Sequence, residues 1–244
     1  LPLSRFDWRQ WRVPPSTLAL GVYGLFGYHF LLFIALRHAP PVQANLVNYL
    51  WPLGIVVMAP LFLRGVTLTA RHVLAALVGF AGAVLAILGG SADGAGSEVT
   101  WAWGYVPALV AAFIWASYSL LTQRVAAFPT AAIGSFAVVS GVLSLLCHVL
   151  LEPAADLSLG DVLLIAGLGL GPLGGAFFLW DAALKRGDPR QIGVLSFLTP
   201  LLSTLVLLAV RGERPSLSVA AAAVMIIGAA IVATRKPVTA NQDR

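Results

Sequence analysis

The chain has 244 residues, of which 59% are hydrophobic and only 10% charged, and its mean hydropathy is +0.90. A soluble globular domain carries about 25% charged residues, so this composition excludes a soluble fold and indicates a polytopic membrane protein. The net charge of +5 does not indicate nucleic-acid binding, because the basic residues lie at the ends of apolar runs, and the single cysteine, Cys147, excludes an internal disulfide.

Eight apolar runs follow a basic, Trp-rich segment at residues 1–16, and each is long enough to span a hydrocarbon core. The connections are short, except for a glycine-rich stretch at 89–99 that is expected to be flexible. The sequence therefore predicts an all-α fold with eight membrane-spanning helices. The predicted spans are 17–36, 41–63, 69–88, 101–123, 130–151, 160–184, 190–210 and 217–234.

The positions of the basic residues predict the orientation of these spans. If the N-terminus is cytoplasmic, the inside connections hold twelve Lys and Arg residues, and the outside ones hold only Arg37, Arg211 and Arg214. Cytoplasmic connections of membrane proteins carry such an excess. We therefore expect both ends of this chain in the cytoplasm.

An internal repeat relates the first three spans to the last three. Shifting the sequence by 148 positions places Gln43 on Gln191 and Pro52 on Pro200, and about thirteen of the 34 positions in 20–53 are then identical. The two copies are five spans apart, so they must cross the membrane in opposite directions. Such an inverted repeat is typical of secondary transporters, whose halves move about a central site.

The fourth and fifth spans have no partner in the first copy, because the shift would place them before Leu1. We therefore expect a five-plus-five parent protein in which two further helices precede this chain; a five-plus-three arrangement is the alternative. The expected organisation is a partial first repeat at 1–90, an outside linker at 91–100, a complete second repeat at 101–237 and a cytoplasmic tail at 238–244.

Both copies carry a short basic hairpin followed by a helix with two prolines, and both close on a Gly- and Ala-rich span at 78–87 and 225–234. In the second copy Ile192 replaces Ala44. The four prolines are Pro41, Pro52, Pro189 and Pro200. This pattern resembles the drug/metabolite transporter superfamily, and within it the EamA-type permeases.

The side chains of Tyr28, His29, Tyr49 and Trp51 make the chain similar to the bacterial aromatic amino acid exporters of that superfamily. The resemblance implies a bacterial inner-membrane protein that exports Phe, Tyr, Trp and other small metabolites by alternating access. It implies the lipid bilayer and a small-molecule substrate as partners, and no cofactor or nucleic acid. A different solute, such as a nucleoside, a sugar derivative or a cationic drug, is the alternative; an intramembrane enzyme or a scaffold is a more distant one. Oligomeric state, a monomer included, stays open.

The side chains expected to line the central cavity are polar or aromatic groups within the spans. Polar groups are costly in lipid, so they should face a wet cavity or a partner helix, and packing between helices is the alternative for each. Asn45, Asn48 and Tyr49 recur at helical spacing on one stripe. The candidates are Tyr28, His29, Asn45, Asn48, Tyr49, Trp51, Trp115, Tyr118, Phe177, Trp180 and Phe197.

Pro52 and Pro200 each remove a backbone hydrogen bond within a predicted span and are expected to break it beside the cavity. Gly169, Gly171 and Pro172 belong to the most flexible run of any span. They are expected to form a hinge, with close helix packing as the alternative.

Asp181 is the only carboxylate deep inside a predicted span, since Asp161 lies at the very start of the span at 160–184, and it precedes Lys185 by four residues. This spacing favours an ion pair on one helix, and proton coupling is the alternative role. The four histidines are scattered, and no nucleophile–base pair or phosphate-binding loop is present. The sequence therefore predicts neither an enzyme nor a metal site.

Overall fold

The computed structural model describes residues 7–89, 102–153 and 156–234, and this part of the chain is helical, without a β-strand. The predicted linker at 91–100 and the predicted tail at 238–244 lie outside the described residues. The α-helices are α1 (Pro15–Val22), α2 (Tyr28–His38), α3 (Pro41–Asn48), α4 (Trp51–Phe62), α5 (Ala70–Gly89), α6 (Tyr105–Leu121), α7 (Ile133–Leu151), α8 (Leu159–Leu170), α9 (Ala176–Leu184), α10 (Pro189–Leu195), α11 (Leu198–Arg211) and α12 (Leu217–Thr234). Short 3₁₀ turns are η2 (Trp8–Trp11) and η4 (Thr130–Ala132), and π-helical turns are η3 (Tyr23–Gly27) and η5 (Gly171–Gly175).

Seven helical segments of the described chain are long and apolar enough to cross a membrane. Helix α6 is a shorter apolar helix of 17 residues, which reach about 26 Å at the helical rise and so nearly match a hydrocarbon core. The predicted all-α, multi-span membrane fold is confirmed. The seven segments are Pro15–His38, Pro41–Phe62, Ala70–Leu88, Thr130–Leu151, Leu159–Leu184, Pro189–Arg211 and Leu217–Thr234.

The largest boundary difference concerns α6, which was expected from residue 101 and begins at Tyr105 after a turn at 103–104. Gly104 explains the turn. A Cβ there would lie 2.7 Å from the carbonyl oxygen of Ala35, because the backbone passes directly over the end of α2. Only glycine permits this close approach.

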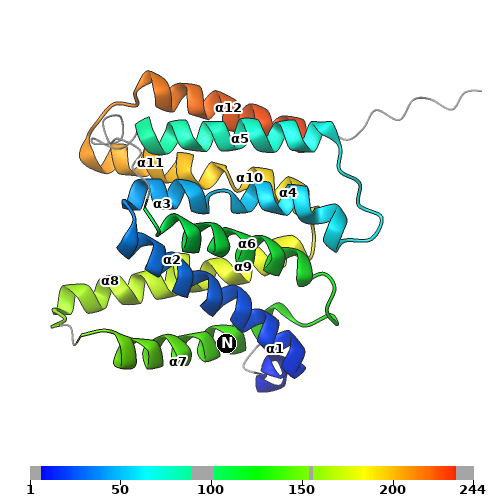
Figure 1. Ribbon diagram of the computed structural model, residues 1–244, viewed down its shortest axis with the longest axis vertical. Helices are drawn as coiled ribbons and strands as arrows, with labels where there is room; N and C mark the ends of the chain where they lie inside the picture. The colour runs from blue at the N-terminus through cyan, green and yellow to red at the C-terminus, as the bar shows by residue number, and fades with distance from the viewer. Residues whose placement is uncertain (1–6, 90–101, 154–155, 235–244) are drawn as a thin grey trace, which may run out of the picture.

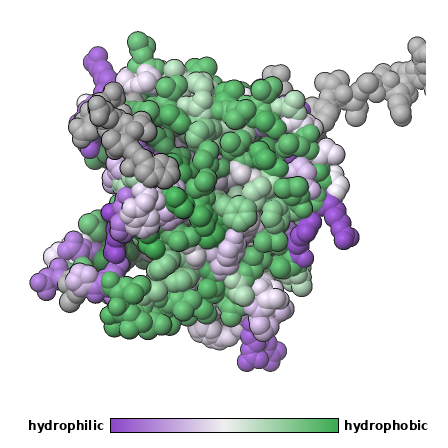
Figure 2. Space-filling view, viewed as in Figure 1, coloured by the Kyte–Doolittle hydropathy of each residue, from purple (hydrophilic) through white to green (hydrophobic). Residues whose placement is uncertain are grey.

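The surface of the spans suits lipid rather than water. In Figure 2 hydrophobic residues cover most of the visible face, and hydrophilic residues gather toward the ends of the spans. On α7 and α8, Leu146, Val149, Leu163 and Leu164 are all more than half exposed. So many exposed apolar side chains would be unfavourable in water, but they are stable in a bilayer, where the surrounding acyl chains are apolar as well.

The repeat is visible in the backbone, since both copies are interrupted at matching places. The first span contains η3 and the sixth contains η5, and the two π turns begin 148 residues apart, at Tyr23 and Gly171. The second and seventh spans are each broken, after Asn48 and after Leu195. Both copies therefore reproduce the same irregular helices.

The matching spans run in opposite directions, as an inverted repeat requires. In Figure 1, α1 and α2 run from right to left, whereas α8 and α9 run from left to right; α5 and α12 are opposed in the same way. Helices α5 and α12 lie side by side at one edge of the bundle. Small residues allow this contact, because a Cβ on Gly82 would lie 2.8 Å from a side-chain carbon of Ile226.

Candidate functional site

A cavity of about 330 Å³ lies among α2, α3, α4, α6, η5, α9 and the break before α11. Nine of the eleven side chains predicted to line a cavity do line this one, although they come from four different spans. Substrate binding by them stays a prediction. The nine are Tyr28, His29, Asn45, Asn48, Tyr49, Trp51, Trp115, Phe177 and Trp180.

Breaks in two spans shape one side of this cavity. Helix α3 ends at Asn48, the next turn tightens through a bond from Leu50 N to Val47 O at 3.1 Å, and α4 begins at Trp51. Pro52 is the second residue of α4, so it lies just after the break and has no N–H to offer the Asn48 carbonyl. The tightened turn before Pro52 therefore interrupts the span, and Pro52 itself does not form the kink.

The seventh span repeats this arrangement. The chain turns at Ser196 and Phe197 between α10 and α11, with a bond from Thr199 N to Ser196 O at 3.0 Å. Pro200 is the third residue of α11. Both predicted proline positions therefore follow a helix break that borders the cavity.

Asn48 lines this cavity and carries a buried polar atom without a partner among the described residues. Its side chain is 3% exposed, and its Nδ2 donates to the Tyr28 hydroxyl at 2.9 Å. Its Oδ1 has no hydrogen-bond partner within the described structure. A buried acceptor without a partner costs about 1–3 kcal/mol, so a ligand donor that reached Oδ1 would recover that cost.

The His29 ring is oriented by its own helix. Its Nδ1 lies 2.7 Å from the Leu25 carbonyl oxygen, so Nδ1 carries the proton in the neutral ring and Nε2 is left as an acceptor. The ring meets Phe177 edge-on at 5.6 Å between centroids. His29 thus adds a second acceptor to the wall that carries Asn48.

Aromatic rings form the neighbouring part of the wall. Trp115 lies among Tyr28, Phe177 and Trp180, at centroid distances of 5.2, 5.5 and 5.8 Å. The Trp180 indole is held in place because its Nε1 donates to the Ser119 hydroxyl at 3.1 Å. None of the described residues that line the cavity is Asp, Glu, Lys or Arg. The site therefore offers ring faces and neutral polar groups.

Two predicted residues lie elsewhere. Tyr118 is 2% exposed and packs between Trp115 and the backbone of η3, where a Cβ on Gly24 would lie 2.3 Å from its ring. Phe197 is fully buried against Phe80 and α5. Tyr118 faces a neighbouring helix, and the turn before α11 rotates Phe197 away from the cavity, so both serve packing.

Ser196 and Thr199 line the cavity although sequence reasoning missed them. The internal repeat contains the signal that would have found them, because a shift of 148 places Asn48 on Ser196 and Trp51 on Thr199. Leu32, Phe33, Leu173 and Ala176 also line it. These four are apolar residues in apolar spans, and no sequence pattern distinguishes them from lipid-facing ones.

Of the expected hinge residues, Pro172 lines the cavity, whereas Gly169 and Gly171 are exposed and a Cβ on either would meet nothing within 4 Å. The glycine that the backbone requires is Gly174. A Cβ there would lie 1.8 Å from the carbonyl oxygen of Gly169 across the π turn. Hinge motion at this segment stays a prediction.

The expected ion pair between Asp181 and Lys185 is confirmed, with Nζ 2.5 Å from Oδ2. Lys185 also donates to the Phe128 carbonyl oxygen at 2.8 Å. Asp181 is 4% exposed and borders a separate cavity near the end of the bundle, not the central one. Proton coupling through Asp181 stays a prediction. No cluster of three potential metal ligands occurs among the described residues.

Comparison with known proteins gives a consistent answer. The model of the EamA-like transporter family matches residues 2–88 and 102–235. An aromatic amino acid exporter YddG from Ancylobacter novellus is 45% identical over 223 residues, which are 91% of this chain and 77% of that protein. The exporter of the same name from Escherichia coli (strain K12) is 28% identical over 240 residues, 92% of this chain and 80% of that protein. A crystal structure with 43% identity superposes with a TM-score of 0.84, covering 93% of this chain and 78% of that chain.

Proposed function

The chain belongs to the EamA-like transporter family, and we propose that it exports aromatic amino acids through the central cavity by alternating access. Two relatives are named as aromatic amino acid exporters. The observation that carries the proposal is the composition of the cavity wall, which joins a group of aromatic rings to two neutral acceptors, Asn48 Oδ1 and His29 Nε2.

The aromatic part of the wall suits the side chain of such a solute. The cavity volume of about 330 Å³ falls within the range of small-molecule sites, about 300–1,000 Å³. The rings of Trp51, Trp115 and Trp180 meet at angles between 34° and 87°. A flat aromatic ring entering among them would gain offset or edge-on contacts with at least one.

The polar part of the wall suits a zwitterion. We propose that the ammonium group donates to Asn48 Oδ1 and His29 Nε2, because both residues line the cavity and carry these acceptors. The carboxylate then lies toward the start of α11, where the Thr199 hydroxyl and the positive end of a half-helix are available. A neutral wall favours solutes whose own charges cancel over those with a net charge.

We further propose that the end of the bundle that carries Arg64, Arg124 and Arg186 faces the cytoplasm of a bacterium, and that the membrane is the inner one. An excess of basic residues at one end supports this orientation. Labelling of single cysteines introduced at Arg64 and at Arg214, after replacement of Cys147 by Ala, tests it in whole cells. An impermeant reagent should reach position 214 from outside, and position 64 only after lysis; the reverse pattern would contradict the orientation.

Transport of labelled tryptophan into liposomes that contain the purified protein tests the function itself. We expect saturable flux that excess phenylalanine or tyrosine inhibits, and that lysine or glutamate inhibits at least tenfold less well. A nucleoside, a sugar phosphate and a quaternary ammonium drug complete the competition panel. Saturable flux of one of these without flux of any aromatic amino acid would contradict the proposal.

The matched variants are Trp115→Ala, within the cavity wall, and Trp103→Ala, at an exposed indole outside it. Trp115→Ala should reduce kcat/KM for tryptophan by about tenfold or more, because ring contacts contribute about 0.5–1.5 kcal/mol in addition to the buried area. Trp103→Ala should leave transport unchanged. Equal losses in both variants would indicate a general effect on folding rather than a binding role.

A further inference from the structure

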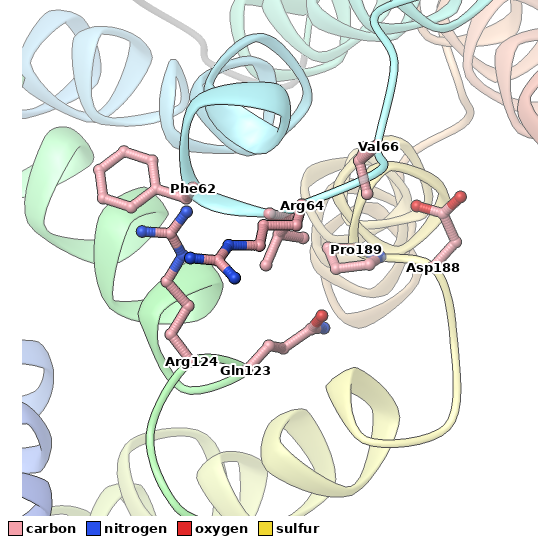
Figure 3. Close-up of a pocket in the computed structure, with 8 residues that line it drawn as sticks. Phe62, Arg64, Val66, Gln123, Arg124, Asp188 and Pro189 are labelled. Atoms are coloured by element: carbon pink, nitrogen blue, oxygen red, sulfur yellow. The ribbon is translucent and has the colours of Figure 1, made fainter.

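A second pocket, of about 640 Å³, lies at the end of the bundle where α4 and α6 finish. Its wall includes Phe62 and Arg64 from the end of α4, Arg124 from the turn after α6, and Asp188 from the turn before α10. It shares no lining residue with the central cavity. Figure 3 shows the guanidinium groups of Arg64 and Arg124 turned toward one another.

The charge of this pocket is not balanced. None of the ion pairs found among the described residues involves Arg64 or Arg124, and Arg124 donates only a long bond, 3.4 Å, to the Leu61 carbonyl oxygen. Two cations held close together repel one another. An anion bound between them would interact favourably with both cations and offset this repulsion.

Asp188, the one carboxylate in the described wall of this pocket, is already engaged. Its Oδ2 accepts from Arg190 Nη2 at 2.6 Å, and its Oδ1 accepts from the Arg190 backbone N–H at 2.9 Å. Burial raises the pKa of Asp188, but the hydrogen bonds from Arg190 outweigh burial and leave the pKa below its usual value. Its negative charge is therefore present and already paired with Arg190, so it does not neutralise Arg64 and Arg124.

An apolar groove of about 510 Å³ follows the same two helices. On α4 it is lined by Leu53 and Val57, and on α6 by Val110 and Phe113. On α4, Met58 lines the groove and Phe62, four residues further on and on the same face of the helix, lines the pocket. At 1.5 Å per residue these two side chains lie about 6 Å apart along the helix axis, well within the thickness of one bilayer leaflet.

We propose that the pocket and the groove together bind an anionic phospholipid. The phosphate lies between Arg64 and Arg124, whose planar guanidinium groups each offer paired N–H donors to phosphate oxygens. One acyl chain follows the groove between α4 and α6. Basic pockets between membrane helices bind anionic head groups in this manner. The lipid then connects α4 of the first copy to α6 of the second.

Native mass spectrometry of the purified protein, titrated with phosphatidylglycerol or with phosphatidylcholine of the same acyl chains, tests the proposal. Phosphatidylglycerol should bind at least tenfold more tightly. The double variant Arg64→Gln/Arg124→Gln should bind phosphatidylglycerol about thirtyfold more weakly, since each basic side chain near the surface contributes about fivefold. Thermal unfolding of the variant confirms that it is folded.

The matched control is Arg9→Gln/Arg12→Gln, which removes the same charge from two exposed arginines before α1, at the same end of the bundle. It should change phosphatidylglycerol affinity less than twofold. Equal weakening by both double variants would show that general surface charge attracts the lipid, and the site would be refuted.

The groove has its own test. Val110→Trp fills it and should weaken binding of long-chain phosphatidylglycerol about tenfold, whereas Val149→Trp, at an exposed position of α7, should not. Inorganic phosphate and glycerol 3-phosphate are the soluble competitors. If either displaces the lipid at millimolar concentration, or if Val110→Trp has no effect, the pocket is a site for soluble anions and the lipid proposal fails.

Discussion

The two copies of the repeat contribute different chemistry to one cavity. His29 and Asn48 of the first copy are polar acceptors, whereas Phe177 and Ser196 occupy the matching positions of the second copy. The Ser196 hydroxyl donates to the Ile192 carbonyl oxygen of its own helix at 2.8 Å, so it is less available to a ligand. The duplicated scaffold brings two walls together around one cavity, and the side chains of these walls have diverged. We propose that this divergence serves the two different ends of one solute.

The backbone of the two copies is more alike than their packing. Both π turns begin at the same point of the repeat, yet the first turn has Phe26 where the second has Gly174. Gly24, in the first turn, is packed against Tyr118, whereas a Cβ on Gly171, in the second, would meet nothing within 4 Å. Both copies therefore have the same irregular backbone, although the side chains that pack against it differ.

The largest expected effect comes from adding a side chain to the second π turn, at Gly174. Gly174→Ala places a Cβ 1.8 Å from the Gly169 carbonyl oxygen, so the π turn must rearrange. We expect the free energy of unfolding to fall by about 2–3 kcal/mol, the upper range for overpacking. Thermal and denaturant unfolding in detergent measure the change.

Gly169→Ala is the control, because a Cβ there meets nothing. It should leave stability unchanged or raise it slightly, since alanine favours a helix over glycine. Combined with Gly171→Ala, it also tests the hinge. If Gly169→Ala/Gly171→Ala is stable and transports at the normal rate, these two glycines are not where the movement occurs.

The polar wall gives the next largest effect. Asn48→Leu keeps the size of the side chain and removes the acceptor Oδ1, which we propose receives the substrate ammonium group. The loss of a hydrogen bond to a charged group, about 1.5–3 kcal/mol, predicts a decrease of at least tenfold in kcat/KM for tryptophan. Liposome flux measures it, and Ser196→Ala, at the matching position, should change flux less than twofold.

Stability distinguishes this role from a structural one. Asn48→Leu removes the bond from Nδ2 to the Tyr28 hydroxyl, but it also removes the buried Oδ1 that has no partner in the described structure. These two effects oppose one another, so the free energy of unfolding should stay within about 1 kcal/mol of its original value. A variant that unfolds easily and loses transport in proportion would indicate that Asn48 supports the helices instead of the substrate.

The aromatic wall gives a smaller effect. Trp180 occupies the position that Leu32 holds in the first copy. Trp180→Leu makes the two copies alike and removes one ring from the group around Trp115, at a cost of about 1 kcal/mol of ring contact. The KM for tryptophan should rise about fivefold with little change in kcat, whereas Leu179→Ala, at an exposed position of α9 outside the cavity wall, should change neither. A fall in kcat with an unchanged KM would contradict a binding role for Trp180.

Much of this fold follows from the sequence, because span length and hydropathy are local properties. The repeat added the direction of the spans, and the polar and aromatic side chains within the spans indicated nine residues that line the cavity. Phe197 was misplaced because a helix break shifts the phase of the residues after it, and a regular spacing cannot anticipate that shift. The sequence also did not predict that Arg64 and Arg124 line the same pocket, because this depends on where the ends of α4 and α6 lie in the folded protein.

The smallest expected effect lies at the matched basic positions Arg37 and Lys185. Lys185 pairs with buried Asp181 on its own helix, whereas Arg37 forms an exposed ion pair with Glu152 at the end of α7. Exposed pairs contribute little, so Arg37→Gln should lower the melting temperature only slightly. Lys185→Gln should lower it clearly more, because it leaves a buried carboxylate without its cation.

The exposed pair also predicts a dependence on pH. Hydrogen bonds from His148 and then from Arg37 hold the pKa of Glu152 below its ordinary value of 4.5. A carboxyl group with a lowered pKa stabilises the folded state above its unfolded pKa and loses that contribution as pH falls through the folded value. The small difference between Arg37→Gln and the original protein should therefore persist at pH 7 and shrink as pH falls below 4.5. A difference that is equally large at low pH would mean that Arg37 stabilises the end of α2 by some contact other than Glu152.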